Sequence, residues 1–259
     1  MSKREEVKML DYSFPIMEEK LTVDGEETGL IGIYHDGEKN KKNLLGYHTD
    51  NYKVLENKTL VELAFQTLEQ SDVAFEINKS QSYVSEKRMY LNLETDKVFE
   101  VGDGDKHKLA FIVQNSYDGS LQYAAMVGAF RLICSNGAII GKTFANTKHK
   151  HVVDFDAEKF KEQIVSGIEN IPALEEMYNR MLEKKVTETW IRKTLENAVT
   201  MNMIGKIDFE QIYEISKNET NAYNFLQIMT FYATHVMKSY ERALRFNTYA
   251  HKKIQKIIE

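Results

Sequence analysis

The amino-acid sequence predicts an α+β protein, with a mostly antiparallel β-sheet in the N-terminal and central part and a helical C-terminal half. Segments in the first part alternate apolar and polar side chains between turn residues, as half-buried strands do. From Asp156 onward the apolar residues recur at helical spacing instead. We therefore expect residues 1–155 to form a sheet domain. Residues 156–259 should form a helical region packed on it, either as a separate unit or within one continuous domain.

The first elements are short. A strand is expected over residues 29–35, and the apolar spacing over residues 60–68 predicts a helix. Three alternating segments, VAFEIN, RMYLNLE and KVFEVG, then predict strands, and residues 102–108 predict a turn.

Two longer strands, KLAFIVQNS and LQYAAMVGAFRLIC, flank the pair Asp118 and Gly119. Asp-Gly between β-rich runs favours a hairpin, because both residues tolerate positive φ. Residues 136–137, Asn-Gly, predict a second turn for the same reason. The isolated Gly128 indicates a β-bulge or a close backbone approach.

Helices are expected in the last hundred residues. Phe160, Ile164 and Ile168 form one apolar stripe, and Pro172 starts a new helix. Further helices are predicted over residues 188–201 and, as the longest, over about 221–246. The run from Asp208 to Gln211 has the spacing of a capping box and predicts the start of a short helix. The chain ends in a basic amphipathic segment, HKKIQKII.

Composition excludes several classes of protein. The net charge is -5, so the whole chain does not coat DNA, and any contact with nucleic acid must be local. The single cysteine, Cys134, permits no intrachain disulfide and indicates a reducing interior. The first ten residues lack an apolar signal core, and no run approaches the ~20 apolar residues of a membrane helix. We expect a soluble cytoplasmic protein with no membrane contact.

The segment from Gly119 to Val153 stands out because it contains no carboxylate. A local positive surface on an acidic chain predicts an anionic partner. Aromatic side chains lie between its cations, and single-stranded nucleic acid is held by this combination of stacking faces and positive charge. The candidate nucleic-acid-binding residues are Arg131, Lys142, Lys148, Lys150, His149, His151, Tyr117, Tyr123 and Phe144.

Structural roles compete with these assignments. Aromatic residues in strands usually belong to the core, and Cys134 in an apolar strand is typical of a small buried side chain rather than of a nucleophile. Arg131 lies between apolar neighbours, where it could equally pair with a buried carboxylate. Asn115 and Asp118 can hydrogen-bond the turn backbone, as Asx residues do.

Other known motifs are incomplete, and we expect no cofactor. Gly141, Lys142 and Thr143 lack the opening glycine of a phosphate-binding loop, because Asn136 stands at that position. His149 and His151 share one face if the segment is extended, and Asp154 or Asp156 could complete a metal site. A solvated polar loop and a phosphate-contacting loop are the alternatives.

The C-terminal region is a second basic segment. From Asn221 to Ile258 the sole carboxylate is Glu241. It stands against Lys238, Arg242, Arg245, Lys252, Lys253 and Lys256. This pattern is compatible with a solvated helix face and a frayed tail, with a second phosphate contact, or with a helix that docks on an acidic neighbouring subunit.

The centre of the chain resembles the phage/plasmid-like protein family catalogued as domain of unknown function 932. The family's Asn-Ser-x-Asp-Gly-Ser turn matches residues 115–120. Its aromatic-Arg-x-x-Cys-x-Asn segment matches residues 130–136, and its basic loop matches Lys148, His149 and His151. The resemblance covers roughly residues 45–200 and excludes the tail after about 205. It implies a mobile-element context and no particular reaction.

The leading hypothesis is a phage-type protein that binds single-stranded DNA, as an annealing or recombination helper that acts as a homo-oligomer. One alternative is a counter-defence protein that binds a host protein or a phage protein. Another is a metal-dependent nuclease built on His149, His151 and Asp154 or Asp156. No catalytic constellation is assembled by the sequence, which favours a binding protein over an enzyme without deciding the question.

Overall fold

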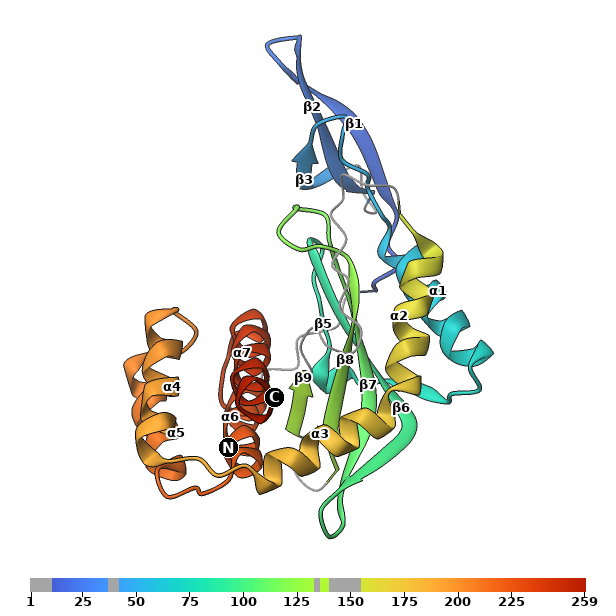
Figure 1. The fold of residues 1–259 in the computed structure, drawn as a ribbon. Helices are drawn as coiled ribbons and strands as arrows, with labels where there is room; N and C mark the ends of the chain where they lie inside the picture. Colours follow the sequence, from blue (N-terminus) through green and yellow to red (C-terminus); the bar gives the residue numbers. More distant parts are fainter. Residues whose placement is uncertain (1–10, 37–41, 133–135, 140–154) are drawn as a thin grey trace.

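The computed structural model describes residues 11–36, 42–132, 136–139 and 155–259 (Figure 1). The expected α+β class is confirmed, because antiparallel sheets precede a run of helices. None of the helices in these ranges combines the length and the hydropathy of a membrane-spanning segment.

The first sheet is a three-stranded antiparallel sheet in the order β1-β2-β3. Its strands are β1 (Ile16–Val23), β2 (Glu26–Asp36) and β3 (Lys42–His48). Asp24 and Gly25 join β1 to β2 with φ of 52° and 84°, which is the backbone of a two-residue hairpin turn. We call β1 and β2 the β1–β2 ribbon. It projects from one end of the molecule (Figure 1).

The second sheet has six strands in the order β4-β6-β7-β8-β9, and β5 pairs with β6. Every pairing is antiparallel. The long central strands form most of it. Its elements are β4 (Phe75–Ile77), the short helix η1 (Lys79–Gln81), β5 (Tyr83–Val84), β6 (Arg88–Val101), β7 (Asp105–Ser116), β8 (Ala124–Arg131) and β9 (Asn136–Ile139).

The turn predictions have mixed outcomes. The β7–β8 hairpin at Asp118 and Gly119 is confirmed. The turn at residues 136–137 is wrong, because both residues belong to strand β9, where they pair with Arg131 and Phe130 of β8. The bulge at Gly128 is also wrong, since both of its strand pairings are in regular register. Asn-Gly tolerates a turn but does not require one.

The helices agree with their predicted positions except near the C-terminus. The expected helix over 221–246 is two helices, because Ser239 interrupts it and its Oγ accepts the Arg242 N–H at 3.4 Å. Asp208 is the third residue of its helix rather than the cap, and it accepts the Gly205 N–H at 2.7 Å. The helices are α1 (Asn57–Gln70), α2 (Ala157–Glu169), α3 (Ile171–Glu183), α4 (Glu188–Thr200), α5 (Lys206–Ser216), α6 (Ala222–His235) and α7 (Tyr240–Ile258).

Helices cover both faces of the six-stranded sheet. α2 lies directly on one face, where a Cβ at Gly167 would meet Phe111 at 2.7 Å and Val127 at 2.8 Å. On the other face Tyr240 and Leu244 of α7 pack against buried residues of the sheet. This packing explains why the central strands are apolar on both sides. One large cluster of buried residues joins strands β5 to β8 of the six-stranded sheet to helices α1 to α7.

Candidate functional site

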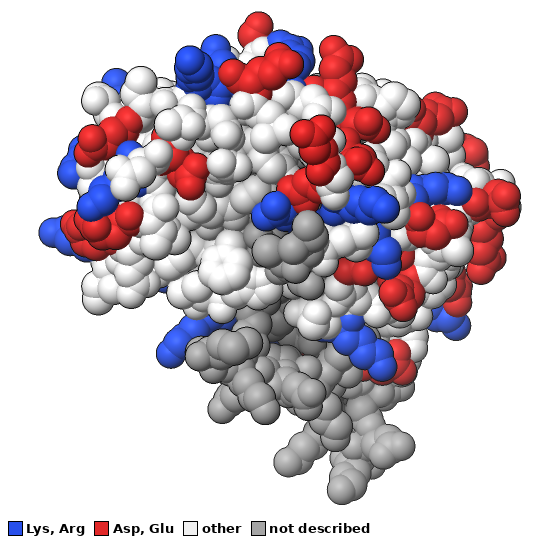
Figure 2. All heavy atoms as spheres, turned by 90° about the horizontal axis from the view of Figure 1, so that it is seen from below, with Lys and Arg blue, Asp and Glu red and all other residues white. Residues whose placement is uncertain are grey.

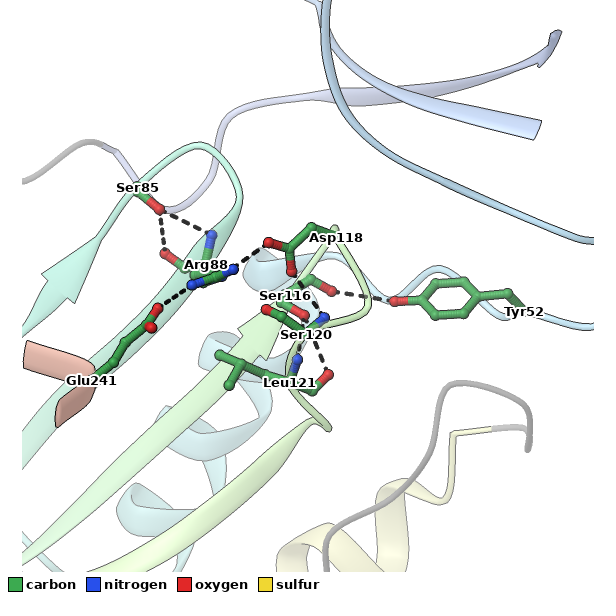
Figure 3. Close-up of polar contacts among 8 residues, drawn as sticks. All are labelled: Tyr52, Ser85, Arg88, Ser116, Asp118, Ser120, Leu121 and Glu241. Carbon is green, nitrogen blue, oxygen red and sulfur yellow. Dashed lines mark hydrogen bonds and ion pairs between the residues drawn. The ribbon is translucent and has the colours of Figure 1, made fainter. Parts of the chain in front are cut away.

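The turn that carries the family-like signature is held by its own polar side chains (Figure 3). Asp118 Oδ1 accepts the Ser120 N–H at 2.9 Å, and Ser116 Oγ accepts the Leu121 N–H at 2.9 Å. Asn115 acts differently, because its amide donates to the Leu55 carbonyl oxygen at 2.7 Å. The turn-stabilising interpretation is therefore confirmed for Asp118. For Asn115 the hydrogen bond instead reaches the segment just before α1.

Arg88 connects this turn to α7 through two ion pairs. No motif or spacing in the sequence predicted this role for Arg88. Its Nε donates to Asp118 Oδ2 at 2.9 Å, and its Nη1 donates to Glu241 (Figure 3). Burial raises the pKa of Asp118, but hydrogen bonds from Ser120 and Arg88 offset this, and the net pKa lies below its usual value. β6, the signature turn and the start of α7 therefore form one connected unit.

The two tyrosines proposed for base stacking lie inside the protein. Tyr117 is 2% exposed, and its Oη accepts the Asn57 N–H at 3.0 Å. Tyr123 is 1% exposed, and its ring meets Phe155 edge-on. Phe144 lies outside the described residues. Neither tyrosine can stack on a base while its ring is buried, and we therefore assign neither of them a role in binding.

Arg131 pairs with a carboxylate. Its Nε donates to Asp105 Oδ1 at 2.8 Å, and its Nη2 lies 2.7 Å from Asp105 Oδ2, which is a two-point contact. Tyr223 Oη donates to the same carboxylate at 2.5 Å and lies 2.8 Å from His107 Nε2. Burial raises the pKa of Asp105, but the hydrogen bonds from Arg131 and Tyr223 bring it below its usual value. The pairing interpretation of Arg131 is confirmed.

A substitution separates the structural role of Arg131 from a DNA role. Arg131→Met should lower the free energy of unfolding by about 2 kcal/mol, because Asp105 would remain mostly buried without its cation. Asp105→Asn combined with Arg131→Met should recover part of that loss. Urea unfolding measures both variants. Unchanged stability together with weaker DNA binding would assign Arg131 to a DNA contact instead.

The remaining candidates in the basic segment fall outside the described residues. They are Lys142, Lys148, Lys150, His149 and His151, together with Cys134 and Asp154. Asp156 is described, and its Oδ1 caps α2 by accepting the Lys159 N–H at 3.0 Å. Within the described ranges no group of three or more His, Cys, Asp or Glu side chains could hold a metal ion.

The structure places four of the C-terminal cations along one outer face of α7, whereas Lys253 is half-buried with its Nζ 5.4 Å from the Tyr249 ring centroid and Lys238 precedes the helix. Positions 242, 245, 252 and 256 repeat at helical spacing, and all four side chains are exposed. Arg242 is the most engaged, with its Nη2 3.4 Å from the Met203 carbonyl oxygen and 4.0 Å from Asp208 Oδ2. We call the following set the α7 cation row: Lys238, Arg242, Arg245, Lys252, Lys253 and Lys256.

The α7 cation row lies on a firmly packed helix. Phe246, Ala250 and Ile254 on the inner face are fully buried, and Ile258 is 8% exposed. Tyr249 donates from its Oη to the Thr194 carbonyl oxygen of α4 at 2.7 Å. The expectation of a frayed tail is therefore wrong, since α7 remains helical to Ile258.

Charges are distributed differently elsewhere. Figure 2 shows the molecule from below the view of Figure 1, and on that face Lys and Arg side chains lie interspersed with Asp and Glu. Neighbouring charges of opposite sign partly cancel each other's field. This face is a poor candidate for a polyanion site compared with the α7 cation row.

The fold and these contacts define a class of α+β protein in which a signature turn on an antiparallel sheet is fastened to a C-terminal helix with an outward row of cations. The chain matches the family described as Domain of unknown function (DUF932) over residues 44–252. This match spans more than half of the chain, so the chain belongs to that family. It includes the C-terminal region that the sequence resemblance had left out, and it begins within β3. No curated protein and no solved structure matches the chain.

Proposed function

We propose that the protein binds single-stranded DNA and promotes the annealing of complementary strands. The α7 cation row carries this proposal. Between Asn221 and Ile258 the sole carboxylate in the sequence is Glu241, which Arg88 engages at the start of the helix, and from another helix Asp208 lies 4.0 Å from Arg242 Nη2. From Arg242 to Lys256 it extends about 21 Å at 1.5 Å per residue, which is long enough to follow a strand over several phosphates. Lys142, Lys148 and Lys150 are proposed as further phosphate contacts.

The binding mode should be dominated by phosphate contacts. Tyr117 and Tyr123 are buried, so base stacking on the signature region does not contribute. The projecting β1–β2 ribbon is acidic, with Glu18, Glu26 and Glu27 exposed. Its carboxylates would repel the phosphates of DNA, so the ribbon is not part of the proposed binding surface. Binding through a row of cations has little sequence preference and depends strongly on salt, because each contact releases bound counterions.

A fluorescence titration tests the proposal directly. A labelled oligonucleotide should bind at about 50 mM salt, and six contacts predict a log-affinity against log-salt slope of about -4 for a single strand. Competition with duplex DNA and with RNA of the same sequence measures preference. Mixing the protein with two complementary labelled strands measures annealing.

The alternative outcome is equally clear. If no strand binds at low salt, the DNA proposal is wrong and the host-protein alternative gains support. If strands bind but do not anneal faster than without protein, the binding part stands and the annealing part is wrong.

A further inference from the structure

The β1–β2 ribbon is an exposed acidic surface without an assigned role. All residues from Thr22 to Gly29 are exposed, including Val23 at 63%. Its one cation, Lys20, lies 2.9 Å from Glu27 and is thereby partly neutralised. The ribbon's carboxylates outnumber that cation, and they are Glu18, Glu19, Asp24, Glu26, Glu27 and Asp36.

The α7 cation row is complementary to this ribbon in charge, but the two lie apart within one molecule. Figure 1 shows the ribbon extending from the end of the molecule beyond the six-stranded sheet, while α7 lies beside the sheet toward the other end. The ribbon tip points away from the body, so it does not reach the row of its own chain. A contact between them therefore requires a second copy.

We propose that the β1–β2 ribbon of one copy docks on the α7 cation row of another copy, head to tail. The carboxylates of the ribbon face the guanidinium and ammonium groups of the row. Val23 at the ribbon tip and Ile207, the exposed chain neighbour of Asp208 beside Arg242, supply apolar contact at 63% and 75% exposure. Such contacts use two different surfaces, so they build chains or rings rather than closed dimers.

The same cations cannot serve the ribbon and DNA at once. Single-stranded DNA carries a higher density of negative charge than the ribbon, so it should displace the ribbon from the row. Self-association through this contact would then keep the row occupied until DNA arrives. The contact itself does not require that the protein bind DNA, and it can be tested alone.

Sedimentation of the full chain provides the first test. The mean mass should exceed that of a monomer at about 50 mM salt and fall to the monomer mass at about 500 mM, because exposed charge pairs are screened. A protein that is monomeric at low salt across accessible concentrations would overturn the proposal.

Two charge-reversed variants identify the surfaces. The ribbon variant carries Glu19→Lys, Glu26→Lys and Glu27→Lys, and the row variant carries Arg245→Glu, Lys252→Glu and Lys256→Glu. Each variant alone should be monomeric, because one of its two surfaces has lost the charge that the other requires. An equimolar mixture should form pairs, since the unaltered ribbon of the row variant meets the unaltered row of the ribbon variant. Thermal unfolding of each variant checks that it folds.

The outcomes separate this proposal from the DNA proposal. The ribbon variant should bind an oligonucleotide at least as tightly as the parent, whereas the row variant should lose binding. If the ribbon variant still self-associates, or if the mixture stays monomeric, the docking contact is wrong whatever the DNA result. If the two variants and their mixture associate as expected and the parent binds no DNA, the docking contact stands and the DNA proposal fails.

Discussion

Replacing Arg242, Arg245, Lys252 and Lys256 together with alanine should lower the affinity for single-stranded DNA by roughly 10³-fold at about 50 mM salt. Each phosphate contact contributes about 0.7 to the salt slope for single strands, so four lost contacts should flatten it by about 3. The loss should be similar for all sequences, because phosphate contacts carry no base information. Titration at several salt concentrations measures both quantities.

A matched control has the same change in net charge. Alanine at four exposed lysines on other elements, Lys58, Lys79, Lys106 and Lys184, should leave the slope nearly unchanged. A second comparison uses Lys142, Lys148 and Lys150, whose joint removal should flatten the slope by about 0.7 per lost contact, or about 2 in all. An unchanged slope in the α7 variant alongside a flattened one in the triple variant would place the binding surface on residues 142–150.

The sequence contained enough local information for most elements but not for their partners. Helices α2, α3 and α4 follow from apolar spacing and from Pro172, which are local signals. The pair Asp24 and Gly25 carries the same hairpin signal as Asp118 and Gly119, and it forms the turn of the β1–β2 ribbon.

The break between α6 and α7 shows where local pattern fails. Apolar residues continue at helical spacing through this region, so the pattern alone predicts one helix. Ser239 caps a new helix because tertiary packing directs Tyr240 and Leu244 onto the sheet. The cations after Glu241 then extend along one helix rather than across a helix and a tail.

The site depended on contacts between distant residues. Arg131 meets Asp105 from 26 positions away, and Arg88 meets Glu241 from 153 positions away. No periodicity reveals such pairs. The burial of Tyr117 and Tyr123 was likewise open, since both flank the strands of the hairpin, where an aromatic side chain can face the core or the solvent.

Acid should destabilise the protein between about pH 6.5 and pH 4, with the buried histidines His107 and His251 as the main cause. Burial lowers the pKa of His107 and of His251 to about 4. His251 is fully buried beside Tyr178, with ring centroids 5.8 Å apart, and neither of its ring nitrogens has a hydrogen-bond partner among the described residues. The folded protein therefore keeps both rings neutral at neutral pH.

The sign follows from proton counting. The unfolded chain protonates each ring near its ordinary pKa of about 6.5, whereas the folded chain resists until about pH 4. The unfolded state binds more protons within this window, so stability falls as the pH falls. Each histidine can contribute up to about 3 kcal/mol to that fall. Urea unfolding at pH 7, above this window, and at pH 5, inside it and above the ordinary pKa values of Asp and Glu, measures the fall in stability.

Substitution of one ring isolates its contribution. His251→Leu should remove roughly half of the stability difference between pH 7 and pH 5. It should cost little at pH 7, because it also removes a buried polar ring without a partner. His235→Gln is the matched control on an exposed histidine and should leave the pH dependence unchanged. If His251→Leu retains the full acid dependence, His251 is not the titrating group, and His107 would have to account for the loss.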